Sequence, residues 1–322
     1  MNTMNTILSG YAVGALLYCP ANAHPSLVSA LVSGRIPTPF SLAFCLEDTV
    51  RAEAVPQAEA ILSDTLRRLR EAASRASFYL PRIFIRVRSP QQLQRLSRNY
   101  RNDTDLVTGF LLPKFSPETC GAYLQVVEDT PDFWYLPILE SPDLLDLSAR
   151  ADRLCFLREQ LNPISSRILN IRVGGNDLCH AFGVRRHVNE TIYDIRPVAN
   201  LLSDIVTTFA PQYVVSGPVW EYYAGFGWDT GLRRELELDL LNGFVGKTVI
   251  HPNQIPVVNA GLRVLPSDYS DARQILSWDT AAEQLVFAGS DAVRMNEVNT
   301  HTRWAKRILC LAEQYGVRED VQ

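Results

Sequence analysis

Charged or titratable side chains stand at the ends of several short apolar segments of this 322-residue chain. The apolar segments are typical of buried strands, and the residues at or just after their ends are Glu47, Asp48, Arg86, Lys114, Glu140, Asp177 and His251. Buried together, such groups cost several kcal/mol each unless they are paired or bind a ligand. Their recurrence therefore predicts one common site.

Glu140 and Asp177 follow consecutive predicted strands, so their carboxylates can converge. Two carboxylates suit Mg²⁺, which prefers oxygen ligands and keeps waters or substrate oxygens in its other positions; Mn²⁺ is the alternative ion. A structural interpretation competes with the metal, because each carboxylate could instead cap a helix. Glu140 precedes Ser141-Pro142, and Asp177 could open a short helix.

Arg86 and Lys114 face the same predicted edge and could hold a substrate carboxylate, which an arginine binds through two parallel hydrogen bonds. The alternative is a structural network in which these two cations neutralise Glu47 and Asp48. His251 is a candidate substrate-binding residue, although a histidine that caps the junction of strand and helix is the plainer interpretation.

Lysine is rare in this sequence, which makes its positions informative. Of 31 cationic side chains, only Lys114, Lys247 and Lys306 are lysines, and the first two lie at predicted strand ends. A buried lysine with a lowered pKa can form a Schiff base with a carbonyl substrate. A lysine Schiff-base aldolase is therefore a competing hypothesis, but it leaves the acidic strand ends unexplained.

The elements that must position these residues alternate along the chain. Strands are predicted at residues 15–19, 41–46, 82–87, 107–112, 134–139, 168–173, 213–215 and 247–250. Helices are predicted between them at 25–33, 52–75, 90–100, 117–127, 142–160, 192–209 and 232–241. Several helices begin at a Ser-Pro pair, where serine caps free amides and proline fits the first turn.

This repetition predicts an α/β fold, a closed (β/α)₈ TIM barrel, in which functional residues collect at the C-terminal ends of the strands. An open doubly wound sheet is the alternative on pattern alone. After the last strand come predicted helices at 252–260, 270–283 and about 300–315, with a β-like stretch at 285–288. We expect a barrel over residues 1–260 and a C-terminal helical extension over 261–322 that is not an independent domain.

The composition is that of an ordinary globular protein. Hydrophobic residues make up 47% of the chain, charged residues 20%, and the net charge is −4, which does not favour non-specific binding to nucleic acid or anionic membranes. The six scattered cysteines, with no CxxC pair, indicate reduced thiols.

The first residues resemble a signal peptide, with an apolar centre and the sequence Ala21-Asn22-Ala23. However, no Lys or Arg precedes Arg35, so the charged start of a signal peptide is missing. No apolar run approaches the ~18 residues of a membrane span. We therefore expect a cytoplasmic protein.

Several stretches of sequence resemble, in their order and spacing, the citrate lyase beta-subunit-like family. They are FCLEDTV, FIRVRS, FLLPKF, LPILES, GGNDL and GFVGKTVIHPNQI, of which the last is the most specific. This family includes malyl-CoA and citramalyl-CoA lyases and belongs to the phosphoenolpyruvate/pyruvate-type barrels. The resemblance runs from about Gly14 to Tyr315.

The resemblance implies a role for each matching residue. Glu140 and Asp177 are implied to be the Mg²⁺ ligands, and Arg86 to bind a substrate carboxylate or carbonyl oxygen beside the metal. Glu47 and Asp48 are implied to organise Arg86 and the metal's waters.

The resemblance also implies a homo-oligomer, such as a trimer, whose C-terminal tail closes over the site of a neighbouring subunit. In that tail, Glu297 stands where the family places an acidic acid/base residue, usually Asp. The chain also departs from the family at Arg88, where an Asn is usual, and in the aromatic loop around Trp220–Trp228, with its three glycines Gly217, Gly225 and Gly227. These departures leave open whether the substrate is a small carboxylate or an acyl-CoA.

Together these features predict a Mg²⁺-dependent carbon–carbon bond lyase. The expected reaction is retro-aldol or retro-Claisen cleavage of a β-hydroxy acid or its CoA thioester through a metal-stabilised enolate. The predicted catalytic residues are Arg86, Glu47, Asp48 and Glu297, with Lys114 and His251 beside Arg86 for substrate binding. The competing hypotheses are a non-catalytic metabolite-binding barrel or subunit of a larger lyase complex, and the Schiff-base aldolase.

Overall fold

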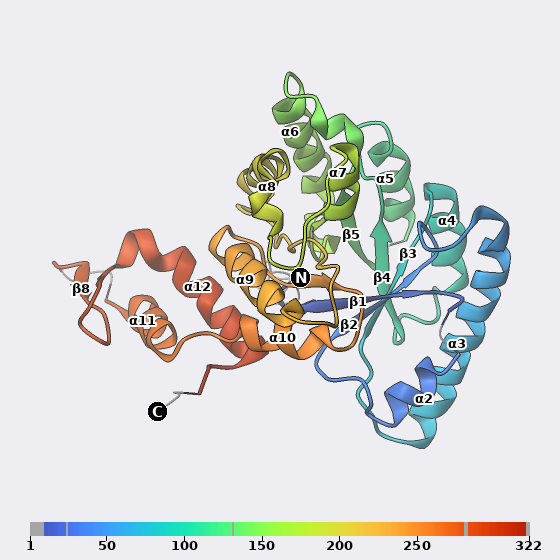
Figure 1. Cartoon of the computed structure of the whole chain (residues 1–322), viewed down its shortest axis with the longest axis horizontal. Coiled ribbons are helices and arrows are strands. Elements are labelled where there is room, and N and C mark those ends of the chain that lie inside the picture. Colours follow the sequence, from blue (N-terminus) through green and yellow to red (C-terminus); the bar gives the residue numbers. More distant parts are fainter. Residues whose placement is uncertain (1–9, 24, 131, 280–282, 320–322) are drawn as a thin grey trace. The chain divides into compact units, whose positions relative to one another are not determined.

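Parallel strands form the core of the first of two units into which the chain divides, Met1–Val258 and Asn259–Gln322. The computed structural model describes residues 10–23, 25–130, 132–279 and 283–319 (Figure 1). Seven strands of the first unit pair in the order β6-β5-β4-β3-β2-β1-β7. Their bounds are β1 Ala15–Pro20, β2 Ser41–Cys45, β3 Arg82–Arg86, β4 Val107–Leu112, β5 Trp134–Leu139, β6 Arg172–Val173 and β7 Lys247–Val249.

Two isolated bridges close the ring between β6 and β7. Val215 bridges to Ile171 and Gly217 bridges to Lys247, both in parallel. Of the predicted strand 213–215, only Val215 forms such a bridge, and the second bridge lies beyond it at Gly217. Pro218, which follows Gly217, has no N–H with which to extend the ladder. The closed (β/α)₈ barrel is the predicted fold, and the open sheet is excluded.

Helices surround the strands, as predicted, with some shifted ends (Figure 1). They are α2 Leu27–Val32, α3 Val55–Arg75, α4 Pro90–Asn99, α5 Cys120–Asp129, α6 Arg150–Leu161, α7 Gly175–Ala181, α8 Arg196–Phe209, α9 Trp228–Leu241 and α10 Gln254–Leu262. Short 3₁₀ turns are η1 Ala52–Ala54, η2 Pro142–Leu145, η3 Asn162–Arg167 and η4 Ile192–Asp194. The predicted helix 142–160 is consequently divided between η2 and α6, and the predicted helix 192–209 between η4 and α8.

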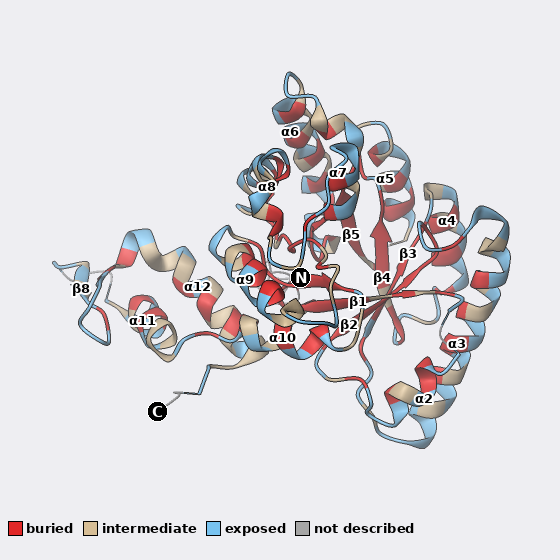
Figure 2. Cartoon of the chain, viewed as in Figure 1, coloured by how far each residue is buried: buried red, intermediate tan, exposed pale blue. Residues whose placement is uncertain are grey.

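Apolar side chains fill the inside of the barrel beneath the strand ends. The cluster draws on five neighbouring strands and the segments beside them, and consists of Val13, Leu16, Ala43, Phe84, Leu111, Leu136, Ile138 and Leu169. In Figure 2 the strands and the helix faces turned toward them are buried, and the outer helix faces are exposed. The interior is thus a packed core, which leaves the C-terminal strand ends as the place for polar groups.

A bulge changes the direction of the side chains along β6. Tyr135 pairs with Ile168, but Ile138 pairs with Arg172. The chain therefore advances by three residues along β5 and by four residues along the segment 168–172, which contains one extra residue. Paired residues of parallel strands point to the same face, and Ile138 belongs to the interior cluster. The bulge therefore turns Arg172 into the barrel, and it is also why the predicted strand 168–173 is regular only at its end.

The second unit contains two helices and a hairpin. These are α11 Pro266–Ser277, the antiparallel pair β8 Val286–Ala288 and β9 Met295–Glu297, and α12 Val298–Tyr315. Strand β9 was not predicted, because its sequence is largely polar. The expectation that 261–322 is not an independent domain stays a prediction. Among the described residues, no helix is long and apolar enough to cross a membrane.

Two glycines test the packing of the first unit. A Cβ at Gly109 of β4 would lie 1.9 Å from the carbonyl oxygen of Trp134, whereas a Cβ at Gly121 of α5 has nothing within 4 Å. We expect Gly109→Ala to lower the free energy of unfolding by about 2–3 kcal/mol through overpacking. The control Gly121→Ala should raise it by up to about 1 kcal/mol, because alanine favours helix. Urea unfolding followed by circular dichroism measures both, and equal effects would contradict this packing of β4 on β5.

Candidate active site

Glu140, directly after β5, has its two carboxylate oxygens in different surroundings. Its Oε1 accepts hydrogen bonds from Arg86 Nη2 and from the backbone N–H of Lys114, both at 3.0 Å. Lys114 has φ 49°, in the left-handed region. The other oxygen faces Gly174, where a Cβ would lie 2.2 Å from Oε2. One oxygen is thus fixed, and the second is turned toward the segment that carries Asp177.

Arg86, the last residue of β3, joins three carboxylates. Its Nη2 lies 3.0 Å from Glu47 Oε2, 3.1 Å from Asp48 Oδ2 and 3.0 Å from Glu140 Oε1. Lys114 Nζ adds bonds of 2.8 Å to Glu47 and 3.3 Å to Asp48. The structural network that the sequence left as an alternative is therefore present, and it extends to Glu140.

Burial and charge set the protonation of this group of side chains. Burial raises the pKa of Glu140 to about 7, against the lowering effect of the Arg86 charge, and the negative charge of Asp177 raises it further. Burial also raises the pKa of Glu47. Counting Asp177, four carboxylates face two cations, so the fully ionised cluster has an excess of two negative charges.

A cavity of about 380 Å³ opens at this end of the strands. Its lining residues come from strand ends and the loops that follow them: Tyr18, Asp48, Thr49, Arg86, Ile138, Glu140, Val173, Gly174, Gly175, Asn176, Asp177, His180, Val219, Thr248 and Ile250. Asp48, Arg86, Glu140 and Asp177, four of the predicted site residues, are thus brought together. Glu47 and Lys114 contact them from behind through the ion pairs described above.

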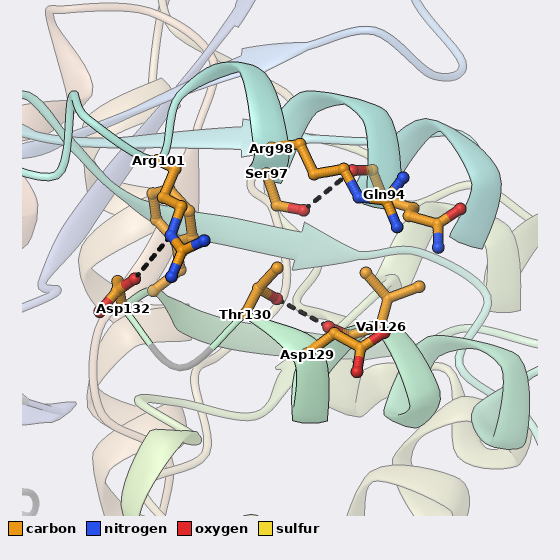
Figure 3. Close-up of a pocket in the computed structure, with 9 residues that line it drawn as sticks. Gln94, Ser97, Arg98, Arg101, Val126, Asp129, Thr130 and Asp132 are labelled. Atoms are coloured by element: carbon orange, nitrogen blue, oxygen red, sulfur yellow. Dashed lines mark hydrogen bonds and ion pairs between the residues drawn. The ribbon is translucent and has the colours of Figure 1, made fainter.

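A second hollow, of about 240 Å³, lies between α4 and α5 (Figure 3). It borders the start of β5, at the opposite end of the strands from Glu140. Several of its polar groups have local partners: Ser97 donates to the Gln94 carbonyl, Thr130 donates to the Val126 carbonyl, and Arg101 lies 3.8 Å from Asp132. The cavity at Glu140 is therefore the candidate active site.

The donor set at the cavity fits a hard divalent cation. Glu140 and the half-buried Asp177 line it together, and the excess of two negative charges matches the charge of Mg²⁺. Within the described ranges, no group of three or more His, Cys, Asp or Glu residues could hold a metal ion. A site here must therefore rely on two carboxylates with waters or substrate oxygens, which is how Mg²⁺ is commonly bound.

Lys247 is committed to a different buried cluster. Its Nζ donates to Glu235 Oε1 at 2.9 Å and to Asp239 Oδ2 at 2.5 Å, and Arg186 Nε lies 3.2 Å from Glu235 Oε2. These side chains are at most 1% exposed. Two cations balance two carboxylates between α9 and β7, a structural arrangement that opposes a Schiff-base role for Lys247. The ion pairs of Lys114 oppose it there as well.

The other predicted positions have their own contacts. The His251 ring stacks on Tyr223, with centroids 4.5 Å apart, and its Nδ1 accepts from the backbone N–H of Asn253. Glu297 ends β9 in the second unit, where its backbone N–H donates to His301 Nδ1. The substrate-binding role of His251 and the acid/base role of Glu297 stay predictions.

Arg88 has a structural contact that the sequence did not indicate. Its Nη1 donates to the carbonyl oxygens of Leu46, Glu47 and Val50 at 3.1, 2.9 and 2.7 Å. It thereby fastens the turn that carries the acidic pair Glu47 and Asp48.

Sequence reasoning missed Tyr18 and Thr248, which line the cavity, and Arg172, whose Nη2 donates to Thr248 Oγ1 at 2.5 Å. The available signal was a charged or hydroxyl side chain inside an otherwise apolar strand segment.

Comparisons with known proteins agree with this architecture. Residues 7–317 match the model of a family described as the C–C bond lyase of the TIM-barrel fold. No curated protein matches the chain.

Solved structures resemble the chain in fold. CitE of Mycobacterium tuberculosis, in complex with magnesium, acetoacetate and coenzyme A, is 19% identical with a TM-score of 0.62, over 94% of this chain and 99% of that one. The citrate lyase beta subunit from M. tuberculosis with oxaloacetate and magnesium is 19% identical with a TM-score of 0.54, over 79% and 98%. RipC from Yersinia pestis is 16% identical with a TM-score of 0.52, over 78% and 95%.

The charges around Glu140 can be tested one at a time in metal-free protein. Asp177→Asn should lower the pKa of Glu140 below about 7, because it removes a neighbouring negative charge, and Arg86→Met should raise it, because it removes a cation. Asp129→Asn, at the exposed end of α5, serves as the control and should leave this pKa unchanged. NMR titration of ¹³C-labelled glutamate carboxyls measures the shifts, and a rise with Asp177→Asn would contradict the arrangement.

Proposed function

The chain belongs to the C–C bond lyase family of the TIM-barrel fold, and we propose that it uses Mg²⁺, held by Glu140 and Asp177, to cleave a β-hydroxy acid or its CoA thioester. The convergence of these two carboxylates and Arg86 on one cavity carries the proposal. The CitE structures that contain magnesium with acetoacetate or oxaloacetate support the same ion and a related substrate class for this chain. Mn²⁺ is expected to substitute for Mg²⁺.

Glu140 and Asp177 are proposed to hold the ion, with Glu140 kept in place by Arg86 and the Lys114 amide. Bound Mg²⁺ supplies a Lewis acid at the substrate oxygens. Gly174 permits this arrangement, because a Cβ there would lie 2.2 Å from Glu140 Oε2 and 2.3 Å from Glu140 Cβ. Asp48 and Glu47 keep Arg86 oriented through their ion pairs.

Arg86 is proposed to bind the substrate oxygen on which negative charge develops. Its Nε is a buried donor without a hydrogen-bond partner among the described residues, and the residue lines the cavity. A donor fixed in advance stabilises such charge more than water does. Lys114 and His251 are proposed to assist substrate binding from the surrounding loops.

In the proposed reaction, a base removes the proton of the substrate hydroxyl, a carbonyl forms at that carbon, and the neighbouring carbon–carbon bond breaks. The electron pair passes to the adjoining carboxylate or thioester group as an enolate beside Arg86, and an acid then returns a proton to carbon. We propose Glu297, from the same or a neighbouring subunit of a homo-oligomer, as this proton carrier. The cytoplasmic location also stays a prediction.

Metal removal and ligand substitution test the proposal. Millimolar EDTA should reduce turnover of hydroxy-acid or acyl-CoA substrates to background, and Asp177→Ala and Glu140→Gln should each weaken Mn²⁺ binding about 100-fold or more by removing one of two protein ligands. Electron paramagnetic resonance of Mn²⁺ gives the affinity, with Asp204→Asn on α8 as control. Turnover that survives complete metal removal, or normal Mn²⁺ binding in both variants, would contradict it.

Metal affinity should depend on pH in a defined direction. Below about pH 7 Glu140 is protonated in the metal-free protein, so the ion must displace a proton before it binds. The Mn²⁺ dissociation constant should therefore rise about tenfold per pH unit as the pH falls below about 7, and level off above it. Calorimetric titration across this range measures the slope, and a constant affinity would contradict the binding of the ion in exchange for the Glu140 proton.

A further inference from the structure

Arg172 is a buried cation without a counter-ion. It is 1% exposed, it forms no ion pair with any described residue, and its Nε and Nη1 have no hydrogen-bond partner there. The other buried arginines of the first unit are paired: Arg86 with Glu140, Arg150 with Asp204 and Arg186 with Glu235. An arginine stays charged, and a buried charge without a partner is costly. The fold therefore retains a charge that its own residues do not neutralise.

This charge lies directly behind the cavity. The bulge in β6 pairs Arg172 with Ile138, and its Nη2 donates to Thr248 Oγ1 at 2.5 Å. Tyr18 is its other neighbour. Burial lowers the pKa of Arg172, and the hydrogen bond to the Tyr18 hydroxyl oxygen acts in the opposite direction. Ile138, Thr248 and Tyr18 all line the cavity. Arg172 thus contacts side chains that line the cavity, although it is not itself part of the lining.

Two hydroxyl groups in front of Arg172 can act as donors. Because Thr248 Oγ1 accepts from Arg172, its own O–H is available to an acceptor elsewhere. Burial raises the pKa of Tyr18 to about 12, so its hydroxyl stays protonated and can also donate. Two O–H donors backed by a guanidinium form a receptor for an oxyanion.

We propose that Tyr18, Thr248 and Arg172 form a second anion subsite, which receives a second carboxylate of the substrate or product. The inference rests on the proposed function, because it takes the first carboxylate to lie at Arg86 and the metal ligands. The substrate class is then a hydroxy acid that has two carboxylates on the fragment that becomes the keto acid, in addition to the carboxylate or thioester that receives the electron pair, so that cleavage leaves a dicarboxylic keto acid. The hydroxyls of Tyr18 and Thr248 make the contacts, and Arg172 is a positioning residue that supplies charge from behind.

Binding of two keto acids tests the subsite. Oxaloacetate has the second carboxylate and pyruvate lacks it, so calorimetry with both, in Mg²⁺ and in EDTA, isolates the subsite. In Arg172→Met we expect the oxaloacetate dissociation constant to rise roughly 30-fold or more, the effect of leaving a charge partner unpaired, while that of pyruvate stays unchanged. Arg150→Met, which removes a paired buried arginine of α6, should change neither.

The melting temperature distinguishes a ligand-binding role of Arg172 from a structural one, because the two roles predict opposite changes on substitution. Without ligand, Arg172→Met should raise the melting temperature, because it removes an uncompensated charge, and Arg150→Met should lower it, because it breaks an ion pair. If Arg172→Met does not fold, Thr248→Val and Tyr18→Phe decide. Each removes one hydroxyl and should weaken oxaloacetate binding about fivefold without affecting pyruvate.

The subsite is overturned if wild-type protein binds the two keto acids equally or not at all, or if Arg172→Met leaves their affinity ratio intact. A lower melting temperature for Arg172→Met would likewise assign it a structural role. Mn²⁺ binding and turnover are measured separately, so the two proposals can fail independently. If wild-type protein in EDTA prefers oxaloacetate over pyruvate and Arg172→Met loses this preference, the subsite is supported even where no metal binds. If metal binding is normal but Arg172→Met keeps the preference, only the subsite is rejected.

Discussion

The site depends on one guanidinium that three carboxylates share. Glu47 and Asp48 follow β2 and Glu140 follows β5, and all three meet Arg86 Nη2 within 3.1 Å. Without this cation, acids from separate strands would repel each other in a buried place. Because Lys114 is the only other cation in this ion-paired cluster and Asp177 adds a fourth acid, the charge of the cluster is not balanced by its own members. The same network that holds the strand ends together thus leaves a demand for positive charge at the cavity.

The Lys247 cluster and the Arg86 cluster of the barrel differ in this respect. Lys247 and Arg186 balance Glu235 and Asp239, and every one of these side chains is at most 1% exposed. That cluster fastens α9 to β7 and has no excess charge with which to attract a ligand. The Arg86 cluster borders a cavity and carries an excess. Net charge and access to solvent, more than the presence of buried ions, separate the functional cluster from the structural one.

Sequence predicted what depends on local pattern. The strands appear as apolar runs, and acids such as Glu140 are conspicuous at their ends because a charge there needs an explanation. Features that depend on pairing between segments were not predictable. The bulge opposite Tyr135 decides that Arg172 points inward, and the sequence around it carries no sign of the register. For Lys247, the position at a predicted strand suggested a residue of the cavity, whereas its partners Glu235 and Asp239 lie on α9. Tyr18 and Thr248 were missed because neutral hydroxyls in strands give no charge signal.

The close approach of Glu140 to Gly174 has an evolutionary consequence. A Cβ at position 174 would lie 2.2 Å from Glu140 Oε2 and 2.3 Å from Glu140 Cβ. Because every residue except glycine has a Cβ, loss of the carboxylate alone does not make room for a side chain at 174. Natural variation should therefore keep this glycine even in lineages that replace the glutamate. A chain with a bulky residue at that position is then a marker of a relative in which the ends of these two strands have been rebuilt.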